Sequence, residues 1–90
     1  KPYGTLAGPD IESQTKQVFE NLSAALQSVG ATFKDLAKVT VYLTDRSDTP
    51  GFMAIKEKYI TSDLPVQTVA IVGLGSPDFK VEVEVIAVLP

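Results

Sequence analysis

The sequence of 90 residues contains no cysteine and no histidine. Without cysteine the chain can form neither a disulfide nor a thiolate metal site. Without histidine it lacks the side chain that most often acts as a general base near neutral pH and most often binds a metal. Catalytic arrangements that pair serine or cysteine with histidine are therefore excluded.

Basic residues and long apolar runs are also scarce. Eight Lys and Arg against eleven Asp and Glu give a formal net charge of −3, and no basic run occurs. Because phosphate-backbone binding draws on clustered Lys and Arg, we expect no nucleic-acid partner. No apolar run approaches membrane-spanning length and no signal peptide is visible, so we expect no membrane partner and predict a cytoplasmic protein.

Apolar residues at helical spacing are present in two segments. They predict a helix over residues 11–29, with Asp10 as N-cap and Gly30 in the left-handed conformation after its end. A shorter apolar stripe predicts a second helix over residues 50–60, with Thr49 as its N-cap. The chain length suits one domain, with both helices belonging to it.

Alternating β-branched and aromatic residues predict three strands, over residues 37–44, 66–72 and 79–89. The strand before the second helix can pair in parallel with a strand after it. The last two strands have a short connection, and we expect them to run antiparallel. The fold class is therefore α+β, with one mixed sheet and both helices packed on one face. A narrow sheet with open edges also favours self-association.

Two glutamates alternate with valines in the last strand. Period two places Glu82 and Glu84 on one face, roughly 7 Å apart by strand geometry. Burial beside apolar neighbours would raise the pKa of at least one carboxyl and suit it to proton transfer. The simpler interpretation is a strand with one solvated face. Gln67 is the second candidate, although a glutamine within a strand is usually a surface or edge residue.

Three blocks of sequence resemble the Rid (reactive intermediate deaminase, YjgF-type) family. Asp10 to Leu22 is similar to the first-helix signature, with Gln14 and Asn21 in the expected places. Asp35 to Asp45 resembles the following strand, and Val81 to Val88 the closing strand. Together the blocks are specific, and the resemblance covers nearly all of residues 5–89.

The resemblance implies a chorismate-mutase-like fold and a homotrimer with small-molecule sites in the clefts between subunits. It also implies a hydrolase that converts reactive enamines and imines to 2-keto acids and ammonia. No metal or organic cofactor is expected, so the lack of histidine and cysteine does not oppose membership.

Two positions carry the site residues that the resemblance implies. The closing-strand glutamate that orients water corresponds to Glu82, which we predict to be catalytic. The family's carboxylate-binding arginine corresponds to Gln67, which we predict to bind substrate; a neutral amide brings neither the charge nor the rigid fork of arginine. We expect Gln67 and Glu82 to face one another across a pocket walled by a neighbouring copy.

The family's typical first strands, including a Ser-Gly-Gln strand lining the cleft, have no match here. We therefore expect a single Rid-like domain over residues 1–90 that lacks those strands, either as a fragment or as a shortened protein. The segment from Tyr59 to Pro65 is also shorter than usual.

Three functions remain open at this stage. The first is Rid-type imine or enamine hydrolysis. The alternative is a non-catalytic trimeric module that binds a small molecule, since Gln67 replaces the arginine. The third is the RNA-cleaving or translation-inhibiting role assigned to some family members, which the acidic balance and the absence of histidine oppose.

Overall fold

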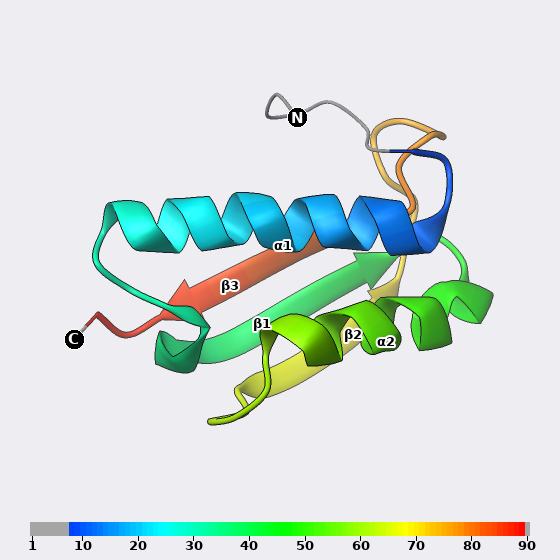
Figure 1. The fold of residues 1–90 in the computed structure, drawn as a ribbon. Helices are drawn as coiled ribbons and strands as arrows, with labels where there is room; N and C mark the ends of the chain where they lie inside the picture. Colours follow the sequence, from blue (N-terminus) through cyan, green and yellow to red (C-terminus); the bar gives the residue numbers. More distant parts are fainter. Residues whose placement is uncertain (1–7, 90) are drawn as a thin grey trace.

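The computed structural model describes residues 8–89, and its elements follow one another in the predicted order (Figure 1). They are α1 (Ile11–Ser28), the 3-10 turn η1 (Phe33–Asp35), β1 (Leu36–Leu43), the 3-10 turn η2 (Arg46–Asp48), α2 (Thr49–Tyr59), β2 (Val66–Ile71) and β3 (Val81–Ala87). Part of the segment ahead of the first helix, residues 1–7, lies outside this range, so the predicted lack of strands there stays a prediction.

Both ends of α1 form as the sequence predicts. At its start, the Ser13 N–H donates to Asp10 Oδ2 over 2.9 Å. At its end, Gly30 has φ of 76°, a conformation that glycine adopts without steric cost. The Gly30 N–H then donates to the carbonyl of Gln27, and the Ala31 N–H to that of Leu26, which satisfies two of the carbonyls in the last turn.

The start of α2 differs from the prediction. Thr49 is the first helical residue rather than the N-cap, and Asp48 occupies the cap position without a side-chain hydrogen bond. The cause is η2, which leads directly into the helix. Thr49 itself has helical dihedral angles, with φ of −56° and ψ of −47°, so it lies inside the helix, and its hydroxyl donates to the Arg46 carbonyl over 2.8 Å.

The sheet has the strand order β2-β1-β3. β1 pairs in parallel with β2, as predicted, and α2 is the crossover between them. β1 pairs antiparallel with β3 on its other side. The last two strands do run antiparallel to one another, but they are not neighbours, because the connection after β2 crosses the end of β1 before β3 begins.

Both helices cover one face of this sheet, α1 over the β3 side and α2 over the β2 side (Figure 1). The inward side chains of β1, Val39, Val41 and Leu43, are completely buried beneath them. Phe19 of α1 and Phe52 of α2 meet above the strand with ring centroids 6.0 Å apart. The predicted two-layer fold is confirmed. Among the described elements no helix covers the other side of the sheet, which we call the open face.

Candidate functional site

The open face carries a compact array of side chains, whose positions follow from the strand register. Since Val39 and Val41 point toward the helices, their neighbours on β1 point away from them, and direct cross-strand partners share that face. The register therefore gives three rows across β2, β1 and β3: Val66–Lys38–Ile86, Thr68–Thr40–Glu84 and Ala70–Tyr42–Glu82.

Glu82 and Glu84 lie together on this open face, which confirms that they share one side of β3. Both side chains are exposed in the single chain. The burial that we expected around them is therefore absent within one subunit. Glu84 also borders a hollow of about 320 Å³ on the same face, whose other lining residues are Lys38, Thr40, Tyr42, Thr68, Val85 and Ile86.

Tyr42 is a polar group of this face that the sequence alone did not single out. It lies directly beside Glu82 across the strands, and Glu84 is the next residue of β3 on the same face. A hydrogen bond to the Glu84 carboxylate, followed by partial burial and the charges of both glutamates, raises the pKa of the Tyr42 phenol above its usual value of 10.0. The alternation of β1 placed Tyr42 on the polar face, but only the register brings it to the carboxylates.

Gln67 lies on the other face of the sheet. It pairs with the buried Val39 and is half-buried beneath α2, where its Nε2 lies 3.7 Å from the Met53 sulfur. Its Oε1 is buried and has no hydrogen-bond partner within residues 8–89. An unpaired buried oxygen is costly, and this one has almost no surface open to water or to a ligand in the single chain.

Gln67 and Glu82 consequently do not face one another within one chain, and this part of the prediction is wrong. The interval of fifteen residues contains the irregular connection between β2 and β3, which breaks the alternation that would relate the two faces. Gln67 aligns with an inward residue of β1, and Glu82 with the outward Tyr42. A site that contains both side chains requires two copies of the chain.

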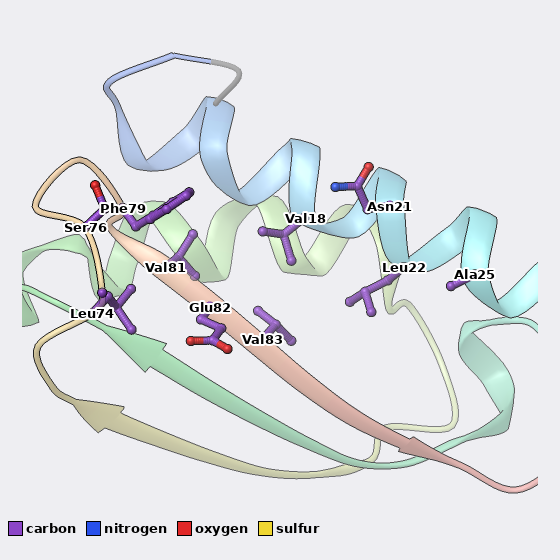
Figure 2. A pocket seen from close by; sticks show the side chains of 11 residues that line it. Val18, Asn21, Leu22, Ala25, Leu74, Ser76, Phe79, Val81, Glu82 and Val83 are labelled. Atoms are coloured by element: carbon purple, nitrogen blue, oxygen red, sulfur yellow. The ribbon is translucent and has the colours of Figure 1, made fainter. Parts of the chain in front are cut away.

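A groove of about 630 Å³ follows the side of β3 that does not pair with β1. α1, the first half of β3 and the connection before β3 enclose it, and its lining residues are Val18, Asn21, Leu22, Ala25, Leu74, Gly75, Ser76, Phe79, Val81, Glu82 and Val83. Figure 2 shows the Glu82 carboxylate on the side of β3 away from α1. Glu82 therefore links the rim of this groove to the open face.

Two kinds of feature are absent from residues 8–89. No group of three or more acidic side chains there could hold a metal ion. None of the helices in this part of the chain is both long and apolar enough to cross a membrane.

Comparison with known proteins gives a matching family and several similar sequences. The sequence model of a family described as Endoribonuclease L-PSP matches residues 1–89. A RutC family protein of Pyrococcus abyssi is 36% identical over 84 residues, which cover 93% of this chain and 66% of the relative. The chloroplastic Reactive Intermediate Deaminase A of Arabidopsis thaliana is 30% identical over 86 residues, which cover 96% of this chain and 46% of the relative.

A solved structure agrees with these matches. A member of the YjgF/YER057c/UK114 family from Mycobacterium tuberculosis superposes with a TM-score of 0.82 and 29% identity, over 87% of this chain and 67% of that one. The chain thus spans about two thirds of the length of relatives such as the Pyrococcus protein.

The contact between Tyr42 and Glu84 predicts a measurable titration. Replacing Glu84→Gln removes the largest cause of the raised pKa, so the phenol of Tyr42 should titrate closer to 10.0. Glu82→Gln, which removes only a weaker charge effect, should lower the pKa less. NMR of the tyrosine rings between pH 8 and 13 measures both shifts. Equal pKa values in Glu84→Gln and the unmodified chain would contradict the contact.

Proposed function

We propose that this chain, which belongs to the Endoribonuclease L-PSP family, hydrolyses reactive enamines or imines to 2-keto acids and ammonia. Its similarity to a RutC family protein and to a YjgF family structure agrees with the YjgF-type resemblance predicted from the sequence. The name of the Arabidopsis relative, a reactive intermediate deaminase, supports this reaction class. No metal or organic cofactor is part of the proposal.

The observation that carries the proposal is the Glu82 carboxylate, exposed on the open face beside the Tyr42 phenol. Glu82 orients a water molecule and accepts its proton as the oxygen attacks the imine carbon. The proton taken up by Glu82 passes to the imine nitrogen and gives a carbinolamine. The carbinolamine hydroxyl then gives up its own proton to the amine as the carbon–nitrogen bond breaks, so that the 2-keto acid and ammonia are formed. An enamine first takes up a proton at carbon to become the imine. Tyr42 keeps its proton through neutral pH, and because its O–H is directed at Glu84, its phenol oxygen can accept a hydrogen bond in the site.

We further propose that the working unit is a homotrimer with the site between copies. Gln67 and Glu82 lie on opposite faces, so one copy must supply each of them. The apolar end of the open face also favours association, because Val66 is 68% exposed and Ile86 is 58% exposed on either side of Lys38. Covering this end would also bury the neighbouring carboxylates, which a single chain leaves in water.

The alternative is a non-catalytic trimeric module that binds a small molecule. The state of Gln67 is what favours it: the amide is neutral, its Nε2 is directed at Met53, and its buried Oε1 has no partner among the described residues. A neutral amide offers a carboxylate neither a positive charge nor a two-pronged donor, so position 67 suits an uncharged ligand better than a keto acid.

RNA cleavage is not proposed, although the family description names an endoribonuclease. The sequence has no histidine for acid–base cleavage and carries a net charge of −3, so a nucleic-acid partner remains unexpected. The cytoplasmic location stays a prediction.

Hydrolysis is tested with 2-aminoacrylate generated in solution, by following the release of 2-keto acid. The unmodified chain should accelerate release, and Glu82→Gln should lower the rate by about a hundredfold or more, because it removes the proton acceptor. Glu57→Gln, the same charge change at an exposed position of α2, is the matched control. A rate equal to the free-solution background for the unmodified chain would remove the deaminase proposal.

Assembly is tested by replacing an apolar residue of the open face. Ile86→Lys places a second cation beside Lys38 and should convert trimers to single chains in sedimentation velocity. Val29→Lys is the control, since Val29 is similarly exposed, at 56%, but follows the end of α1 on the helical side. A single-chain mass for the unmodified protein would contradict the trimer.

The two functions are separated by Gln67→Arg. If the cleft is built for a keto acid, the guanidinium fork should raise pyruvate affinity about tenfold or more, as a charge-assisted hydrogen bond would. Gln67→Lys supplies the charge without the fork and should gain less. Titration calorimetry measures both. No gain in either variant would indicate that position 67 does not face a carboxylate site.

A further inference from the structure

A buried glutamine of α1 joins three segments of the chain. Gln14 is only 4% exposed, and each polar atom of its amide is used. Its Nε2 donates to the Gly8 carbonyl over 3.1 Å and to the Asp78 carbonyl over 2.9 Å. Its Oε1 accepts from the Lys80 N–H over 2.8 Å. The segment before α1, the helix itself and the connection before β3 therefore meet at one side chain.

The connection that Gln14 holds is a wall of the groove beside β3. Residues 72–80 have no helix or strand, and four of them, Leu74, Gly75, Ser76 and Phe79, line the groove. Their own main-chain support is sparse: the Phe79 N–H donates to the Ser76 carbonyl, and the Val72 N–H to the Leu43 carbonyl. The bonds from Gln14 to Asp78 and Lys80 connect the second half of this segment to α1.

The same bonds fix the point at which β3 begins. Lys80 is held through its N–H by Gln14 and through its carbonyl by the Thr44 N–H, at the end of β1. Val81 then pairs with Leu43, and Glu82 with Tyr42. Glu82 thus stands two residues beyond Lys80, whose N–H and carbonyl are both hydrogen-bonded, and this limits where the Glu82 carboxylate can lie.

The glutamine amide satisfies this arrangement. An amide provides two N–H donors and an acceptor oxygen, matching two carbonyls and one N–H. Glutamate in its ionised form has no donor for the carbonyls, lysine has no acceptor for the Lys80 N–H, and methionine has neither. Because Gln14 is buried and its three hydrogen bonds are partly buried, groups that lose their partner there are only partly compensated by water.

We propose that Gln14 is a positioning residue of the candidate site: it holds the connection before β3 against α1 and thereby sets the groove wall and the placement of Glu82. The catalytic consequence rests on the proposed hydrolysis, whereas the structural consequence does not. Gln14 itself is buried and need not touch the substrate.

Amide hydrogen exchange measured by NMR tests the structural consequence without reference to activity. In Gln14→Met the Lys80 amide should exchange at least about tenfold faster, since its acceptor is lost, while the Val41 amide in the centre of the sheet stays protected. Gln14→Glu keeps an acceptor for the Lys80 N–H and should give a smaller acceleration there; it also serves if Gln14→Met does not fold. Gln27→Met, at an exposed position of the same helix, is the control.

Several results would overturn the proposal. One is a Lys80 amide that exchanges no faster in Gln14→Met and Gln14→Glu than in Gln27→Met. Another is equal acceleration at Lys80 and Val41, which would make Gln14 a general stabiliser of the fold. In the 2-aminoacrylate assay, kcat should fall about tenfold or more in Gln14→Met and stay unchanged in Gln27→Met. Unchanged kcat in Gln14→Met would exclude a role in placing Glu82, whereas an inactive unmodified chain would refute the hydrolysis alone, since exchange still reports on the anchor.

Discussion

Burial of one side of β1 beneath two helices is the constraint on which the rest of the molecule depends. Val39, Val41 and Leu43 have no exposed surface, and Phe19 and Phe52 close over them from α1 and α2. Because side chains alternate along a strand, a register shift of one residue would expose these apolar side chains to water and bring polar groups into the core. The register of β1 is therefore tightly specified. Pairing with β1 then decides which side chains of β2 and β3 point toward the helices.

The positions of the polar groups follow from this strand pairing. Tyr42, Glu82 and Glu84 gather on the open face because each pairs with, or lies on, an outward position of β1 or β3. Gln67 aligns with Val39 and is drawn beneath α2 instead. A single chain thus divides its candidate residues between two faces, and a second copy becomes a structural requirement for any site that uses both. Gln14 has a different role: through its hydrogen bond with the Lys80 N–H it sets where β3 enters the sheet.

Local signals in the sequence predicted most of the elements well. Asp10 and Gly30 marked the two ends of α1, because capping depends on hydrogen bonds and dihedral angles within a few residues. Thr49 is not the N-cap because the turn η2 runs directly into α2 and gives Thr49 helical dihedral angles, a continuation that the sequence does not reveal. The antiparallel direction of the last two strands was right, but the insertion of β1 between them depends on contacts distant in sequence.

The sequence by itself determined the family, the α+β class, the inward and outward sides of β1, and the common face of Glu82 and Glu84, since all of these follow from periodicity, caps or short motifs. Only the tertiary structure decided that Gln67 and Glu82 lie on opposite faces, that Tyr42 meets the two carboxylates, and that Gln14 bonds to Asp78 and Lys80. The physical reason is that alternation is preserved only within a continuous strand. Across an irregular connection, the facing of the next strand is set by which partner it pairs with and in which register.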